Sequence, residues 1–216
     1  MSKLAMPRDI RTNPAFSRAR AAGRLPLRAF TLVEVLIVVV VLGIAGAMVI
    51  PSMSQTGVLR VQASVRTLVA DITYLQGEAM AFQARRAIWF GKVPRWDTSS
   101  NTWTYVDGNG YTMAEVTGPT LTLSTNAMRD PDHPDRPMGR DFSEAKYGGA
   151  VISSPEFNGG AIMIFDELGG TVAELDGPDP GSGGSVTITG SGASFRVDVQ
   201  AYTGKVTVTK TADIAH

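Results

Sequence analysis

The most pronounced hydropathy feature of the chain is an apolar run that starts at Phe30 and stops at Pro51. Glu34 is the single charged residue within it. A run of about 20 apolar residues is long enough to cross a bilayer as a helix. The pattern therefore predicts that residues 30–51 form the membrane-spanning half of a helix, with a helix bend at Pro51.

A second pattern follows Pro51, in which apolar residues recur at alternating steps of three and four. This spacing places them on one face of a helix and leaves polar residues on the other faces. The apolar face comprises Val58, Val61, Val65, Leu68, Ile72, Leu75, Ala79 and Phe82. The other faces carry Arg60, Gln62, Arg66, Thr67, Asp71, Thr73, Gln76 and Glu78. Residues 52–83 are thus predicted to be an amphipathic helix half, which forms a coiled coil or, as we favour, covers a sheet.

Strand-like sequence fills the rest of the chain, residues 84–216. Short runs rich in β-branched and aromatic residues alternate there with turn residues. The clearest strands are predicted at 87–93, 102–106, 161–165, 185–189, 194–201 and 205–209. Shorter candidates lie at 121–123 and 150–152, within a weakly patterned stretch from 111 to 160. The Asp-Gly-Asn-Gly sequence at 107–110 is predicted to be a turn.

These patterns together predict an α+β fold, in which a long N-terminal helix packs on an antiparallel β-sheet head domain. The chain has no Cys, so the head must rely on packing. Its two His residues, His133 and His216, leave little basis for His-based catalysis or a zinc site. No nucleophile elbow, metalloprotease motif or phosphate loop is present in the sequence. We therefore predict neither an enzyme nor a cofactor.

The formal net charge of zero conceals an uneven distribution. Seven basic residues and one acid precede Phe30, which leaves 13 of the 20 basic and 19 of the 20 acidic residues after it. Residues 1–29 are predicted to be a cleaved, cytoplasmic leader whose charge orients the following span. A basic arm for nucleic acid or anionic lipid is the alternative. The remaining chain is acidic.

The carboxylate of Glu34 requires a positively charged partner at the edge of a membrane. No Lys or Arg follows within the apolar run, and Arg28 is the nearest cation in the sequence. A cut before Phe30 would create a charged α-amino group at the head of the helix. Pairing of this amine in one subunit with Glu34 of another would set the register of stacked helices.

The residues from Arg28 to Glu34, Arg-Ala-Phe-Thr-Leu-Val-Glu, resemble the class III signal of type IV pilins and type II secretion pseudopilins. The resemblance extends to Pro51, where the family carries a helix-bending proline. It implies that a prepilin peptidase cuts between Ala29 and Phe30, that Phe30 is N-methylated, and that Glu34 guides subunit assembly. The family has Gly at the position of Ala29.

Two segments of the head are similar to the H-type minor pseudopilins, the GspH/FimT family. The first is Ile164-Phe165-x-x-Leu168-Gly169, which matches a Phe-x-x-x-Gly turn. The second is Tyr202-Thr203-Gly204-Lys205-Val206, which matches a closing Thr-Gly-Arg-Val hairpin with Lys205 in place of Arg. This resemblance implies a minor subunit that initiates a filament or lies near its tip.

Two alternatives concern the N-terminal segment. A secretory signal peptide would use Ala45-Gly46-Ala47 as its cleavage site, but Glu34 and the length of the run disfavour it. A plain membrane anchor would make Glu34 incidental.

Three further stretches could be binding sites, but we favour an ordinary structural role for each. Residues 129–137, with a Ca²⁺ site as the alternative, and residues 176–184, with a Ca²⁺ or phosphate site as the alternative, are interpreted as solvated loops. The aromatic residues of the first hairpin are interpreted as cross-strand packing, with a binding platform as the alternative; they are Trp89, Trp96, Trp103, Tyr105 and Tyr111.

The expected function is that of a minor structural subunit of a type II secretion pseudopilus that supports protein export. Its expected partners are other pilins or pseudopilins, prepilin peptidase, the inner-membrane assembly platform and, before assembly, membrane lipid. The expected location is the bacterial inner membrane with the head in the periplasm, and then the filament. The alternatives are a type IV minor pilin that binds DNA in uptake, and a tethered binding domain that does not polymerise. Nucleic acid is not expected as a partner, because Arg85, Arg86, Lys92 and Arg95 form the one dense basic cluster of an acidic chain.

Overall fold

The computed structural model describes the backbone of residues 30–213 and, within that range, the side chains of residues 30–46 and 57–211. The chain divides into two compact units, Met1–Ile44 and Ala45–His216. Its helices are α1 (Leu32–Phe82), α2 (Leu123–Asn126) and the 3₁₀ turn η1 (Ala145–Tyr147). Its strands are β1 (Arg86–Asp97), β2 (Thr102–Glu115), β3 (Gly139–Asp141), β4 (Val151–Phe157), β5 (Ile162–Phe165), β6 (Gly183–Gly190), β7 (Ala193–Gln200) and β8 (Val206–Asp213).

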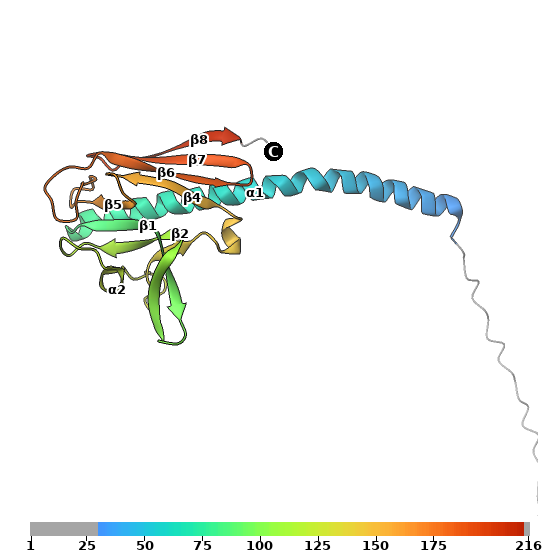
Figure 1. Cartoon of the computed structure of the whole chain (residues 1–216). Coiled ribbons are helices and arrows are strands. Elements are labelled where there is room, and N and C mark those ends of the chain that lie inside the picture. Colours follow the sequence, from blue (N-terminus) through green and yellow to red (C-terminus); the bar gives the residue numbers. More distant parts are fainter. Residues whose placement is uncertain (1–29, 214–216) are drawn as a thin grey trace, which may run out of the picture. The chain divides into compact units, whose positions relative to one another are not determined.

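The second half of α1 buries the face that the three-four spacing predicts. Val61, Leu68 and Ile72 are completely buried, and so are Leu75 and Ala79. They belong to one core cluster with residues of both sheets, and this part of α1 lies along the sheets in Figure 1. The prediction that the helix covers a sheet is confirmed. Phe82, which was assigned to the same face, is 64% exposed and is the last residue of α1.

The bend expected at Pro51 stays a prediction. The backbone is helical at this residue, but the side chains of residues 47–56 lie outside those that the structure describes.

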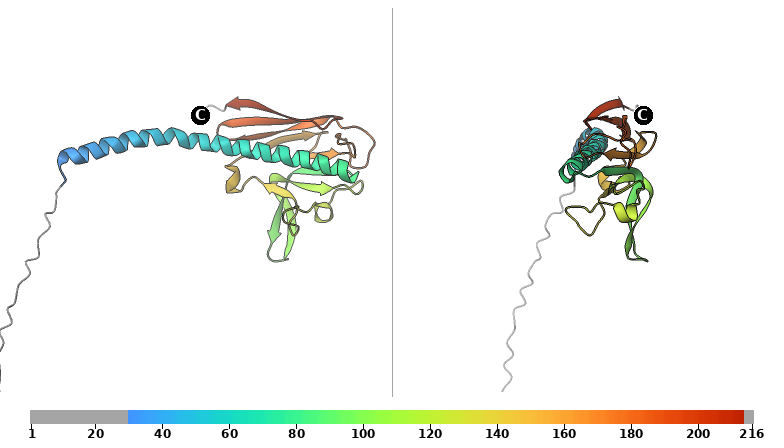
Figure 2. Two further views of the ribbon diagram at one scale, coloured as in Figure 1. Left: turned by 180° about the vertical axis from the view of Figure 1, so that it is seen from behind. Right: turned by 90° about the vertical axis from the view of Figure 1, so that its left-hand side faces the viewer.

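The strands form two four-stranded antiparallel sheets, with orders β3-β2-β1-β5 and β4-β6-β7-β8. In the end view of Figure 2 the strands lie beside the helix. Their inner faces share the core: Ile88, Phe90 and Met113 come from the first sheet, and Val186 and Val197 from the second. The long helix packed on antiparallel sheets confirms the predicted fold class.

The turn predicted at residues 107–110 is wrong, because this segment lies inside β2. Asp107 pairs with Lys92 of β1, and the pairing resumes at Tyr111 and Phe90 after an irregularity. The glycines are needed here because neighbouring atoms come close to the backbone, and not because the chain turns. A Cβ on Gly108 would lie 2.5 Å from Val93 Cγ2, and one on Gly110 would lie 1.9 Å from the carbonyl oxygen of Arg140.

The weakly patterned stretch from 111 to 160 contains the rest of β2, then α2, β3, η1 and β4. The strand predicted at 150–152 is found as the start of β4. The one predicted at 121–123 is wrong, since α2 begins at Leu123. The C-terminal strands β5 to β8 agree with the predicted ranges within a few residues, because their alternation is regular.

Candidate functional site

The first candidate site is the beginning of α1, where the signature residues form a helix cap. Thr31 precedes the helix, and its Oγ1 accepts a hydrogen bond from the Glu34 N–H at 3.2 Å. The Thr31 carbonyl accepts a second bond from the Val35 N–H at 3.2 Å. A Thr followed three residues later by Glu is the sequence of a capping box. The carboxylate of Glu34 thereby stands in the first turn, where the helix dipole favours negative charge.

Phe30 and Val35 occupy the two positions of a hydrophobic staple around this cap. Together with Glu34 and Val38 they line a shallow, almost entirely apolar groove of about 230 Å³. The signature is therefore a self-contained helix start. The role of Thr31 was missed in the sequence, although the Thr-x-x-Glu spacing would have predicted it.

Every described residue from 30 to 46 is exposed in this chain. Leu32 is 83% exposed and Phe30 is 77% exposed. None of the ion pairs among the described residues involves Glu34. Its pairing with the amine of Phe30 in another subunit remains a prediction, and Ala29, on the other side of the predicted cut, lies outside the described residues. The described helices include none that is long and apolar enough to cross a membrane.

A second group of polar side chains lies between α1 and the first sheet of the head. The side chain of Asp71 is 8% exposed, whereas the helical periodicity predicts it on a polar face. Arg140 donates from Nε to Asp71 Oδ2 at 2.8 Å and from Nη2 to Oδ1 at 3.1 Å. The Tyr111 hydroxyl donates to Oδ2 at 2.7 Å. Periodicity alone gave no sign of this cluster, because Arg140 lies 69 residues farther along the chain.

This cluster joins α1, β2 and β3 through charge-assisted hydrogen bonds, which are the stronger kind. The bond to Asp71 raises the pKa of Arg140 above its usual range. Burial, and then the negative charge of Asp71, raises the pKa of the Tyr111 hydroxyl well above its ordinary value. Arg140 and Tyr111 thus both keep their protons at neutral pH. The arrangement is a structural clamp.

The two head motifs singled out in the sequence meet at one helix residue. Gln76 Nε2 donates to the carbonyl oxygen of Gly169 at 2.7 Å and to that of Thr203 at 2.9 Å. Gly169 and Gly204 both have positive φ, 83° and 60°. A Cβ on Gly204 would lie 2.4 Å from the Gly169 oxygen. The Phe-x-x-x-Gly turn and the Thr-Gly-Lys turn therefore need glycine for conformation and for close approach.

The aromatic residues of the β1–β2 hairpin are divided between two faces. Tyr111 is buried in the core. Trp96 and Trp103 meet edge to face with ring centroids 5.3 Å apart. A hollow of about 450 Å³ lies beside them, and its lining includes Trp89, Trp103 and Tyr105. This hollow is the geometry that the tethered-binder alternative requires.

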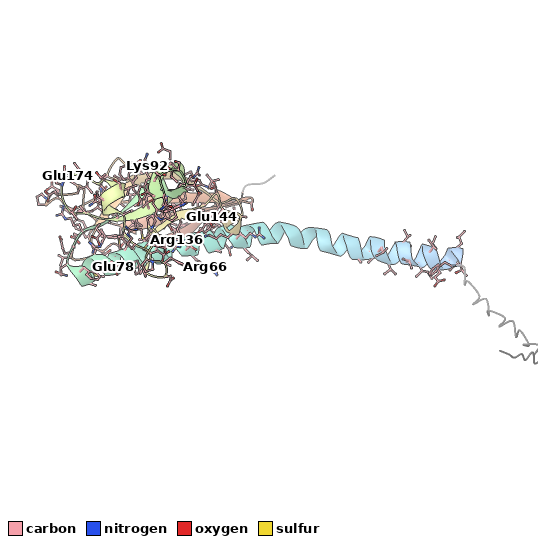
Figure 3. All side chains as sticks on the ribbon, turned by 90° about the horizontal axis from the view of Figure 1, so that it is seen from below. Arg66, Glu78, Lys92, Arg136, Glu144 and Glu174 are labelled. Atoms are coloured by element: carbon pink, nitrogen blue, oxygen red, sulfur yellow. The ribbon has the colours of Figure 1, made fainter. Side chains whose placement is uncertain are left out.

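Most of the dense basic cluster is occupied by contacts within the head. Arg85 donates to the carbonyl oxygens of Leu175 at 2.9 Å and Gly177 at 2.8 Å. The side chain of Arg86 is 7% exposed. Lys92 lies 2.8 Å from Asp107 and is labelled in Figure 3. Because a phosphate backbone is bound by accessible cations, this arrangement disfavours the DNA-binding alternative. In the part of the chain that the structure describes, no acidic, His or Cys residues gather as a metal site.

Comparison with known proteins identifies the N-terminal segment. Residues 28–50 match the model of the prokaryotic N-terminal methylation motif. No curated protein and no solved structure matches the chain. The matched residues include the cap formed by Thr31 and Glu34 and the exposed apolar helix that follows it. The chain therefore combines the N-terminal methylation motif, which type IV pilin-like proteins carry, with a long helix packed on antiparallel sheets, a fold consistent with that of pilins.

Proposed function

We propose that this protein is a minor subunit of a type II secretion pseudopilus or of a closely related type IV filament. The observation that carries the proposal is the methylation motif at residues 28–50 on a helix whose described residues 30–46 are all exposed. An apolar helix surface of this length requires lipid or other helices around it. Residues 30–50 insert in the inner membrane before assembly and lie among neighbouring helices afterwards.

In this proposal prepilin peptidase cuts between Ala29 and Phe30, and the new amine of Phe30 is methylated. The amine of one subunit then pairs with Glu34 of its neighbour. The cap supports this role, because it fixes the carboxylate in the first helical turn beside the chain end. The partners are other pilin-like subunits, the peptidase and the assembly platform of the inner membrane. The type II system and a place near the filament tip rest on the two head motifs, whose turns meet at Gln76.

The decisive experiment replaces Glu34 and follows insertion, processing and filament incorporation separately. We expect Glu34→Ala to insert and to be cut as usual, yet to enter filaments about tenfold less, a coupling of about 1.4 kcal/mol or more. Both variants keep the backbone N–H at position 34 that the cap uses. Glu34→Gln also keeps the size of the side chain, so it isolates the effect of the charge. Glu156→Ala, which removes an exposed carboxylate of the head, is the matched control.

Normal incorporation of Glu34→Gln would contradict a role for the charge, and normal incorporation of both variants would contradict the assembly proposal. The mass of the native N-terminal peptide tests the processing step independently. It should begin at Phe30 and carry one added methyl group. Mature protein that retains residues 1–29 would instead favour a tethered domain that does not polymerise.

A further inference from the structure

The two sheets of the head have four free edges, and three of them are protected. β3 has three residues and β5 has four. β4 contains Pro155 and a register break between Ser153 and Glu156. Shortness, proline and bulges are the features by which proteins block strand addition at a sheet edge. These edges are therefore poor templates for another strand.

The fourth edge, β8, has eight residues and no proline, and Lys210 is the one charged residue among its first five. It pairs with β7 in regular register from Val206 to Lys210, and the irregularity comes after that point. Within the described residues no strand pairs with its other side. Its sequence there alternates Val with Thr. β8 thus presents a row of backbone N–H and C=O groups along its outer side.

A groove of about 460 Å³ runs beside this edge, between β8 and α1. Its lining is mostly apolar and includes Val65 and Val69 of α1, Phe195 of β7 and Val208 of β8. Val208 lies opposite Val197, so both side chains point to the helix side of the sheet. Val197 is completely buried, whereas Val208 is 45% exposed. The apolar core therefore extends to β8, where it is partly exposed to solvent.

Arg66 gives the groove a charge. It lies in the lining, is exposed and extends outward from α1 in Figure 3. Among the described residues it has no ion pair. The exposed Lys205 stands at the start of β8. A ligand that follows this edge would therefore gain from one carboxylate near Lys205 and another near Arg66.

We propose that the β8 edge and its groove bind an extended segment of another protein, which adds a fifth strand to the sheet. A strand satisfies the open backbone groups of β8, which a helix or a small molecule does not. Every second side chain of the added strand enters the groove beside Val208, so these residues are apolar. An acidic residue of the segment pairs with Arg66. This binding site is on the head and is independent of filament assembly through the N-terminal helix.

The test uses the full-length protein in detergent micelles and a synthetic peptide with blocked ends, in which Val alternates with Thr and Glu stands at both termini. Amide hydrogen exchange locates the bound peptide, because a new strand protects amides that were open. We expect saturable protection of residues 206–210, and none when alternate peptide amides are N-methylated. A peptide with Lys in place of Glu should bind about fivefold more weakly.

Val208→Asp should weaken binding of the Glu peptide about tenfold. Val151→Asp is the matched control, because Val151 lies on the protected edge β4 of the same sheet and is 47% exposed. Val208→Thr keeps the shape and the strand preference, so a smaller loss with this variant excludes misfolding as the cause. Arg66→Glu should reverse the preference between the Glu and Lys peptides.

Several outcomes would overturn the proposal. They are absence of saturable binding, protection away from β8, equal binding of the N-methylated peptide, or equal losses with Val208→Asp and Val151→Asp. Protection of β8 that rises with protein concentration when no peptide is present would assign the edge to a second copy of this chain. That result would also replace the proposal made here.

Discussion

The two described parts of α1 differ in what surrounds them, although they belong to one helix. From residue 30 to 46 every side chain is exposed, and the sequence is apolar on all sides. From residue 58 to 79 most apolar side chains form one stripe, and that stripe packs into the core with the two sheets. A helix with one apolar face finds its partner within the chain, whereas a helix that is apolar all round needs its surroundings from outside.

One carboxylate from each part, Glu34 and Asp71, repeats this difference. Asp71 receives three hydrogen bonds, from Arg140 and Tyr111, within the head. Glu34 holds the backbone cap with Thr31 and takes part in no ion pair of the described residues. Asp71 is thus part of the fold, and Glu34 is available for assembly. Unfolding of the head, measured in variants of each part, tests this contrast.

The largest expected effect comes from the same substitution made in each part of the helix. Leu68→Ala removes a completely buried side chain from the core and should lower the free energy of unfolding of the head by about 3 kcal/mol. Leu36→Ala, at a position that is 59% exposed, should leave it unchanged. Urea unfolding of the full chain in detergent, followed by fluorescence of the three Trp residues of the head, gives both values. Equal losses would show that the two parts unfold as one unit.

A smaller loss is expected when the buried carboxylate is removed. Asp71→Ala leaves Arg140 and Tyr111 without their acceptor and should cost about 2 kcal/mol, less than a fully buried ion pair, because Arg140 is 30% exposed. The double variant Asp71→Ala with Arg140→Met should recover part of this loss. Glu34→Ala is the contrasting variant and should not change unfolding of the head. A double variant that is less stable than Asp71→Ala would argue against the clamp.

The smallest expected effect appears at high pH. In the unfolded chain Tyr111 loses its proton near pH 10, whereas burial and Asp71 raise its pKa well above that in the fold. The stabilisation is complete below pH 10 and is lost as the pH rises above it, by at most about 1.4 kcal/mol per pH unit. Arg140 opposes the shift and Tyr147 adds to it.

Tyr111→Phe should cost about 1.5 kcal/mol at pH 7 and should reduce the loss of stability between pH 10 and pH 11. Urea unfolding at the three pH values measures both effects. Tyr105→Phe is the control, since burial raises the pKa of Tyr105 as well but no buried carboxylate adjoins it. An unchanged slope above pH 10 in Tyr111→Phe would mean that other groups cause the alkaline loss.

The two edge strands of the second sheet also differ in whether they are complete within the chain. β4 is closed to further pairing by Pro155 and a register break, and β8 is open beside an apolar groove. As with the two parts of α1, one element is complete within the chain and the other is not. The incomplete elements are where partners are proposed to bind.

Local pattern by itself determined the start of α1, its apolar stripe and the C-terminal strands, because neighbouring residues decide periodicity and caps. The Phe-Thr-x-x-Glu signature was likewise readable without coordinates. Tertiary structure decided whatever depends on distant residues. Asp71 is buried in the fold, where Arg140 donates a hydrogen bond to it. Gly108 and Gly110, which were expected in a turn, lie inside β2 at points of close contact. Tertiary structure also left one edge of a sheet uncovered, which no single segment reveals because a strand becomes an edge only through the order in which the others pair.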